Sequence, residues 1–193
     1  MVRYGEDHKE RTRQRIIEAS GRRLKLDGID GSGVATLMKD ADLTNGAFYA
    51  HFSSKEDLVA QTVAAQLQAQ RESLVAALRD YGIATVVRNY LSLAHRGDVE
   101  HGCPSAALLD EISRSGTSVR DTYTRGILDL ADEIAALLRP DDPQAARVRV
   151  LATMAQLAGT MQLARALTDP QLVNELLDDA SRTILGQLQT RSS

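Results

Sequence analysis

The chain has 193 residues, a formal net charge of −3 and a single cysteine. This length allows one large or two small domains with a substantial core. One cysteine excludes an internal disulfide, and the slight negative charge does not by itself indicate a nucleic-acid-binding surface. No apolar run is long enough to span a bilayer and no secretory signal is visible, so we expect a cytoplasmic protein without a membrane partner.

Helix signals follow one another along the whole chain. Asp7 and Glu10 form a predicted capping box for a first helix, which Gly28 ends. Later helix starts are marked by Ser53-x-x-Glu56, Pro104, Asp142-Pro143 and Asp169-Pro170. We expect helices near residues 7–27, 34–41, 45–51, 54–79, 83–96, 104–114, 117–138, 143–167 and 170–188. Because no alternating run indicates a strand, the predicted fold class is all-α, with about nine helices.

The segment 33–55 has the most specific pattern in the chain. Apolar residues recur at helical spacing from Val34 onward and give a first short helix an apolar face. Asp42 interrupts the pattern and tolerates the left-handed backbone of a tight turn. A second short helix follows at residues 45–51, with Thr44 as its cap. Two short helices joined in this way are typical of a helix-turn-helix, whose second helix enters the DNA major groove.

The end of this segment resembles the DNA-binding domain of the TetR/AcrR family of transcriptional regulators. The residues that carry the resemblance are Tyr49, His51, Phe52, Lys55 and Leu58, in the order Y-x-H-F-x-x-K-x-x-L. Ile16-Ile17 and Leu24-x-x-x-Gly28 fit the family's first helix, so the resemblance covers residues 8–60. Two positions depart from the family pattern: Asp42 stands where Gly is usual, and Gly33 where Thr is frequent.

The resemblance implies a helix-turn-helix DNA-binding domain at residues 1–53 and a helical ligand-binding and dimerisation domain at residues 54–193. A phenol, an imidazole and an ammonium can each reach phosphate oxygens, and an asparagine suits an adenine edge. The candidate DNA-binding residues are Ser32, Thr36, Thr44, Asn45, Gly46, Ala47, Tyr49, His51 and Lys55.

The two C-terminal helices have broad apolar faces. Such faces pack inside one chain, and the resemblance implies that the same helices also pair with those of a second chain in a four-helix bundle. The candidate interface residues of this homodimer are Leu151, Ala155, Ala158, Val173, Leu177 and Ile184.

The helices of the body are expected to enclose an apolar pocket for a small-molecule ligand, because pockets in helical proteins form between helices. Tyr offers a polar group there and Met adapts its shape. The candidate lining residues are Tyr90, Leu108, Tyr123, Met154 and Met161.

Catalytic patterns are missing from the sequence. There is no nucleophile motif and no phosphate-binding glycine loop. Asp110-Glu111 and Asp178-Asp179 are adjacent on helices and therefore point in different directions. The four histidines and the cysteine do not have metal-ligand spacing. We therefore expect neither an enzyme nor a cofactor or metal.

Cys103 is the one chemically notable residue outside the DNA-binding segment. It precedes Pro104 at the expected start of a helix, where the helix dipole stabilises a thiolate. Free cysteine is also a common buried residue, so packing is the alternative to a redox-sensing role.

The function most consistent with these patterns is a DNA-binding repressor. A small-molecule ligand would release it from a pseudo-palindromic operator, as the resemblance implies. A regulator switched by electrophile or oxidant modification of Cys103 is one alternative. A helical ligand-binding or scaffold protein without operator binding is an alternative of another class.

Overall fold

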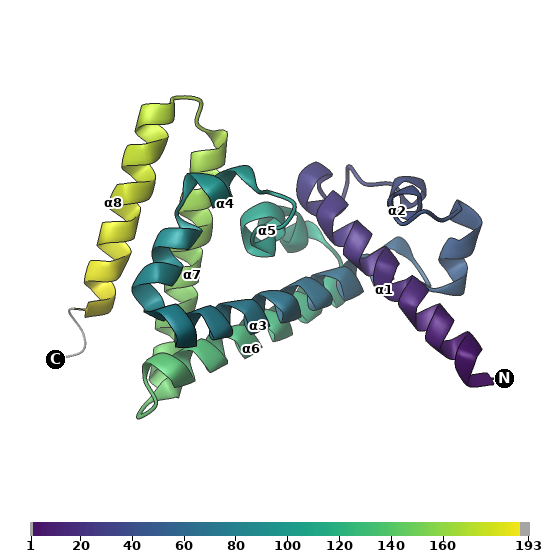
Figure 1. Cartoon of the computed structure of the whole chain (residues 1–193), viewed down its shortest axis with the longest axis horizontal. Helices are drawn as coiled ribbons and strands as arrows, with labels where there is room; N and C mark the ends of the chain where they lie inside the picture. Colours follow the sequence, from purple (N-terminus) through teal and green to yellow (C-terminus); the bar gives the residue numbers. More distant parts are fainter. Residues whose placement is uncertain (1, 190–193) are drawn as a thin grey trace.

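The computed structural model describes the backbone of residues 2–189 and the side chains of residues 7–188. Every regular element within these bounds is a helix, nine in number, which confirms the predicted all-α class (Figure 1). The elements are α1 (Val2–Asp27), α2 (Val34–Asp40), the 3₁₀ helix η1 (Asn45–Ala50), α3 (Lys55–Tyr90), α4 (Leu93–Gly97), α5 (Pro104–Arg114), α6 (Thr117–Leu138), α7 (Pro143–Ala166) and α8 (Pro170–Gln189).

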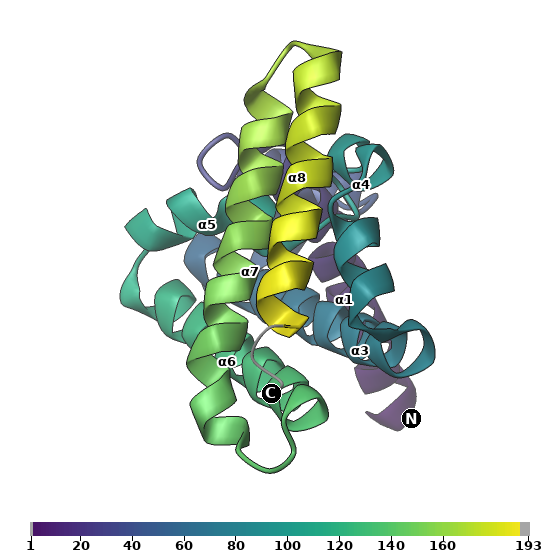
Figure 2. The ribbon, with the colours of Figure 1, turned by 90° about the vertical axis from the view of Figure 1, so that its left-hand side faces the viewer.

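The first three elements, α1, α2 and η1, form a head at one end of the molecule (Figure 1). The long helix α3 leads from the head into the body, which consists of α3 to α8, and α6 packs along α3. The helices α7 and α8 form an antiparallel pair at the end farthest from the head, and they lie side by side in both views (Figure 2).

The start of α3 is capped one residue later than predicted. Ser54 is the N-cap, and its hydroxyl oxygen accepts a hydrogen bond from the Asp57 backbone N–H at 3.0 Å. The Asp57 carboxylate accepts in return from the backbone N–H and the hydroxyl of Ser53, both at 2.9 Å. The N-cap is therefore Ser54 and not Ser53, and the acidic partner is Asp57 and not Glu56, because the first helical residue is Lys55. The pattern differs from a capping box in that Asp57 reaches back to Ser53, the residue before the N-cap.

Of the other predicted helix starts, three are confirmed and one is wrong. Pro104, Pro143 and Pro170 each occupy the first position of a helix, as predicted. The capping box at Asp7 is wrong, because α1 already begins at Val2 and Asp7 lies inside it. Gly28 does end α1, with a φ of 81°.

The predicted break at Tyr81 and Gly82 is a kink inside one long helix. Gly82 has a φ of 76° and a ψ of 166°, a conformation that favours glycine, and α3 resumes directly after it. The second limb of α3 ends at Tyr90, and the separate short helix α4 follows. The kink turns the chain so that both limbs of α3 can line one cavity.

The largest hydrophobic cluster joins the head to the body. It contains Ile16 and Leu24 of α1, Phe48 of η1, Leu58 of α3 and Ile112 of α5, all of them buried. Burying apolar side chains from six helices in one cluster stabilises the position of the head, because any separation would expose this surface to water. Two further clusters hold α7 to α8 and α6 to α7.

Candidate DNA-binding head and body cavity

The turn between α2 and η1 has the conformation that the sequence predicts. Asp42 is the one non-glycine residue with a positive φ in the described part of the chain, at 55°. The backbone N–H of Leu43 donates to the Met38 oxygen at 2.9 Å and closes the turn. Arg23 of α1 forms two hydrogen bonds to the Asp40 carboxylate, at 2.6 and 3.1 Å, and thereby fixes the end of α2 against α1.

The aromatic residues of the segment have two different environments. Phe48 and Phe52 are 1% and 2% exposed and stack at 5.8 Å between ring centroids. Tyr49 is 79% exposed and touches Phe48 only by an edge-to-face contact at 5.1 Å. The two phenylalanines therefore hold η1 in place, while the Tyr49 hydroxyl faces solvent.

The exposed polar positions around η1 form a small surface. Thr36, Thr44, Asn45 and Gly46 are exposed together with Tyr49. Thr44 is the N-cap of η1 as predicted, but its side chain accepts no capping hydrogen bond and stays available. Ala47 is half-buried and packs against the largest hydrophobic cluster. We call Thr36, Thr44, Asn45, Gly46 and Tyr49 the η1 surface.

Ser32 does not belong to this surface, which corrects the sequence prediction. Its side chain is fully buried, and its hydroxyl donates to the Gly28 oxygen at 2.7 Å. The N-cap of α2 is Gly33, which provides no side-chain cap. A hydroxyl buried within the turn after α1 cannot reach a DNA phosphate.

His51 and Lys55 lie at the edge of the head and are half-buried. The Lys55 ammonium donates to the Ile29 oxygen at 2.6 Å, so it ties α3 to the turn after α1. The Nδ1 atom of His51 is buried without a hydrogen-bond partner. Burial lowers the pKa of His51, and the nearby cations Lys9 and Arg13 lower it further. Both residues thus have structural surroundings that sequence reasoning did not foresee.

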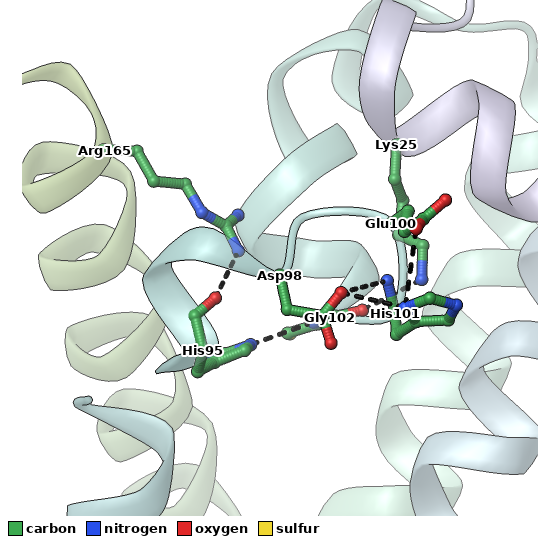
Figure 3. A network of polar contacts seen from close by, with 8 residues as sticks. Lys25, His95, Asp98, Glu100, His101, Gly102 and Arg165 are labelled. Atoms are coloured by element: carbon green, nitrogen blue, oxygen red, sulfur yellow. Dashed lines mark hydrogen bonds and ion pairs between the residues drawn. The ribbon is translucent and has the colours of Figure 1, made fainter. Parts of the chain in front are cut away.

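Long-range polar contacts connect the head to the body. The Lys25 ammonium donates to the Gly102 oxygen at 3.1 Å, and the Ile29 backbone N–H donates to the Glu111 carboxylate at 2.6 Å. Figure 3 shows the first of these contacts beside the loop that precedes α5. A shift of α5 would therefore act on the end of α1 through two hydrogen bonds.

His95 lies at the centre of the same network (Figure 3). Its Nδ1–H donates to the Tyr90 oxygen at 2.7 Å, and its Nε2 accepts from the Cys103 backbone N–H at 3.3 Å. Both contacts together require a neutral ring. Arg165 of α7 donates to the His95 oxygen at 3.2 Å and brings a cation close to the ring.

Stability should therefore fall in mild acid. Burial lowers the pKa of His95, the cations Arg165 and Lys25 add to this, and the Tyr90 hydrogen bond and Asp98 oppose it. Because the folded-state pKa lies below the unfolded value of about 6.5, the unfolded chain takes up the proton first as the pH falls. The contribution of the neutral His95 to the free energy of unfolding is thus fully present above pH ~6.5. Below this pH the contribution decreases, by at most about 1.4 kcal/mol per pH unit for each such histidine.

Thermal unfolding of the parent protein and of His95→Gln between pH 7.5 and 5.5 measures this effect. The variant should lose less stability over this range, because its side chain does not titrate. His51 contributes with the same sign in both proteins and cancels in the comparison. His101→Gln, an exposed position, is the control. An equal loss in the parent protein and in His95→Gln would contradict the role of His95.

A cavity of about 520 Å³ lies inside the body. Most of its lining residues are apolar, and they come from α3, α5, α6, α7 and α8. Of the five predicted lining residues, Tyr90, Tyr123 and Met154 line the cavity. Leu108 and Met161 do not, since each is packed in a hydrophobic cluster. The predicted helices are present, and α8 adds Leu185 and Leu188, which the sequence analysis did not include.

Cys103 is the N-cap residue of α5, as the sequence predicts, and its side chain is buried. Gln70 donates to its sulfur at 3.2 Å. Cys103 lines the body cavity, and it also lines a second hollow between α1, α3 and the loop that precedes α5.

Four of the predicted interface residues are buried within the single chain. Ala158, Val173, Leu177 and Ile184 belong to the cluster that joins α7 to α8, and a second chain cannot contact them in this arrangement. Ala155 is exposed and Leu151 is half-buried. The apolar pattern located the helices correctly, but it did not distinguish the inner face from the outer one.

The exposed face of α7 consists of small and apolar residues. Their spacing places them on one side of the helix, which has no cover within the described part of the chain. They are Val148, Ala152, Ala155, Gly159, Leu163 and Ala166. We call this set the α7 face.

No helix in the described part of the chain is both long and apolar enough to cross a membrane. Among residues 7–188 there is also no group of three or more His, Cys, Asp or Glu side chains that could hold a metal ion.

The fold and the η1 surface define a helix-turn-helix protein with an attached helical body. Residues 16–62 match the family model described as bacterial regulatory proteins, tetR family. Residues 16–62 thus match the DNA-binding segment of this family, and the chain as a whole has the fold of TetR-family transcriptional regulators. Members of this family are DNA-binding regulators and not enzymes, in agreement with the sequence analysis.

Solved structures with the same fold cover nearly the whole chain. A TetR-family transcriptional regulator from Cytophaga hutchinsonii has a TM-score of 0.73 at 20% identity, over 93% of this chain and 96% of its own. One from Agrobacterium tumefaciens has a TM-score of 0.72 at 21% identity, over 93% and 98%. The transcriptional regulator FadR from Bacillus subtilis, in complex with stearoyl-CoA, has a TM-score of 0.59 at 19% identity, over 91% and 96%. No curated protein sequence matches the chain.

Proposed function

We propose that the protein is a homodimeric repressor that binds a pseudo-palindromic operator and leaves it when a small molecule occupies the body cavity. The observation that supports this most is the η1 surface. Its polar side chains are exposed on an element that two buried phenylalanines hold firmly. Pre-positioned polar groups at the start of a recognition element suit contacts to base edges and phosphates.

The two parts of the chain would have different roles. Residues 1–53 would bind DNA, and residues 54–193 would bind the ligand and form the dimer. Thr44 and Asn45 are suited to base edges, Tyr49 to a phosphate, and Lys55 adds positive charge beside them. In a dimer, two such heads would enter successive major grooves about 34–36 Å apart.

The α7 face supports the dimer. An exposed stripe of small and apolar residues permits a second helix to approach closely and to exclude water. The corresponding helix of another copy has the same composition, which suits a two-fold symmetric contact.

The cavity supports control by a ligand. Its size lies in the range of small-molecule sites, and its lining is mostly apolar. FadR, which has the same fold, was solved with stearoyl-CoA. Ligand and operator would weaken each other by the same factor, because both act on one conformational equilibrium.

Selection of duplexes from a random library, followed by titration of the selected operator, tests operator binding. Asn45→Ala should change the selected sequence, whereas Tyr49→Phe should weaken binding to all sequences by about threefold to tenfold. Tyr81→Phe is the matched control, because Tyr81 is an exposed tyrosine on α3. If the parent protein selects no duplex, the alternative without operator binding replaces this proposal. Equal affinities of the parent protein and Tyr49→Phe would remove Tyr49 from the binding surface.

The alternative with a redox switch at Cys103 has less support. The sulfur is buried and accepts a hydrogen bond from Gln70, which does not favour attack by a reagent in bulk solvent. Operator release by an electrophile in the parent protein, but not in Cys103→Ser, would restore this alternative.

A further inference from the structure

A group of uncharged polar side chains lines one end of the cavity. The amide of Gln70, the phenols of Tyr90 and Tyr123, the thiol of Cys103 and the hydroxyl of Ser105 all line it. Gln70 Nε2 donates to Cys103 Sγ at 3.2 Å, and Ser105 Oγ lies 2.8 Å from Tyr123 Oη. A side-chain hydrogen bond also links Tyr90 to Cys103. We call these five residues the polar end.

The hydrogen bonds of the polar end are incomplete. Gln70 Oε1 is buried and has no partner. Ser105 and Tyr123 have two hydroxyl protons and share one hydrogen bond, so one proton lacks an acceptor within this pair. A buried polar atom without a partner is costly, and a bound molecule can supply the partner. The polar end therefore offers one acceptor and one donor to a ligand.

The charges around the cavity disfavour an ion at this end. Of the described residues that line the cavity, none is Asp or Glu, so nothing neutralises a cation. The lining cations are Arg139 and Arg149 at the junction of α6 and α7. Arg165 and Lys25 lie close enough to Cys103 to act on it, but neither lines the cavity, and both donate to backbone oxygens. Along α6, Arg139 is about 24 Å from Tyr123 at 1.5 Å per residue. Burial also raises the pKa of Tyr90 and of Tyr123, so both phenols stay neutral.

We propose that the cavity binds an elongated, uncharged apolar molecule that places a hydroxyl group at the polar end. This hydroxyl accepts a hydrogen bond from the Ser105–Tyr123 pair and donates one to Gln70 Oε1. The remainder of the ligand lies against the apolar side chains of α3, α6 and α7. The inference rests on the proposed function only in taking this cavity as the regulatory site.

Calorimetric titration of the purified protein with four matched probes tests the ligand class. They are 1-decanol, decyl methyl ether, decanoate and decylammonium, each below its aggregation limit. We expect 1-decanol to bind most tightly. The ether cannot donate to Gln70 Oε1 and should bind about threefold to tenfold more weakly. The two ions should bind more weakly still, because each must lose its hydration at the polar end. Tighter binding of decanoate would overturn the proposal and place the anionic group near the two arginines.

Variants locate the hydroxyl within the cavity. Gln70→Leu should reduce the preference for 1-decanol over the ether while still binding the ether, because only the alcohol donates to Gln70 Oε1. Tyr81→Phe, outside the cavity, should keep the preference of the parent protein. Thermal unfolding checks that each variant folds. If Gln70→Leu folds and retains the full preference, the hydroxyl does not lie at the polar end and the proposal fails.

The test of the ligand class can fail or succeed independently of the test of operator binding. Calorimetry needs no DNA, so the ligand class can fail while operator binding stands. Conversely, tight binding of 1-decanol without any selected operator would keep the ligand class and reject the repressor.

Discussion

Phe48→Ala should unfold the head, whereas Tyr49→Ala, one residue further along, should leave it folded. Phe48 is 1% exposed and lies between the Tyr49 and Phe52 rings within the cluster that joins the head to α3. Removing a buried phenyl ring costs about 3–5 kcal/mol, because apolar contacts are lost and a cavity remains. Tyr49 is 79% exposed, so its removal should cost little stability.

Chemical unfolding followed by circular dichroism, together with operator titration, separates the two effects. Phe48→Ala should lose stability and binding together. Tyr49→Ala should keep the unfolding curve of the parent protein and lose affinity. A loss of stability in Tyr49→Ala as large as in Phe48→Ala would show that η1 is held differently from the arrangement described here.

Ala155→Arg should convert the proposed dimer into monomers with much weaker operator binding. Ala155 is exposed at the middle of the α7 face, so an arginine there would place a charge and a long side chain between two closely packed helices. Losing the second head removes the advantage of two linked half-sites, which is on the order of hundredfold or more. Ala158 is unsuitable for this test, because it is buried within the chain and an arginine there would disrupt the α7–α8 packing.

Sedimentation at micromolar concentration and operator titration measure the two consequences. Ala76→Arg is the matched control, since Ala76 is an exposed alanine on α3, away from the α7 face. The control should remain a dimer with the affinity of the parent protein. A dimer in Ala155→Arg, or a monomer in the unmodified protein, would rule out the α7 face as the interface.

Local rules accounted for most of what the sequence predicted correctly. A proline at the first helical position, an aspartate in a tight turn and a glycine after a helix each act within a few residues. Pro143, Asp42 and Gly28 are therefore where the sequence placed them. The one-residue error at Ser53 has the same origin, because two adjacent serines offer nearly equal caps.

The wrong predictions concern which face of a helix is buried and which residues it contacts. Ala158 and Ala155 look alike in the sequence, yet one lies inside the chain and the other outside. Ser32 looked like an exposed cap, but the turn after α1 folds over it and buries its hydroxyl. Apolar and small residues at helical spacing indicate that one face of a helix is buried. They do not indicate which other helix packs against that face.

The sequence by itself determined the helices, the helix-turn-helix and the aromatic cluster that closes it, because these depend on caps, turns and periodicity over short distances. Only the tertiary structure decided which polar groups meet. Lys55 and Ile29 are 26 residues apart, and Ile29 and Glu111 are 82 apart. The polar end of the cavity likewise joins residues of α3, α5 and α6. Such contacts depend on how whole helices pack against one another, and periodicity within one helix contains no information about them.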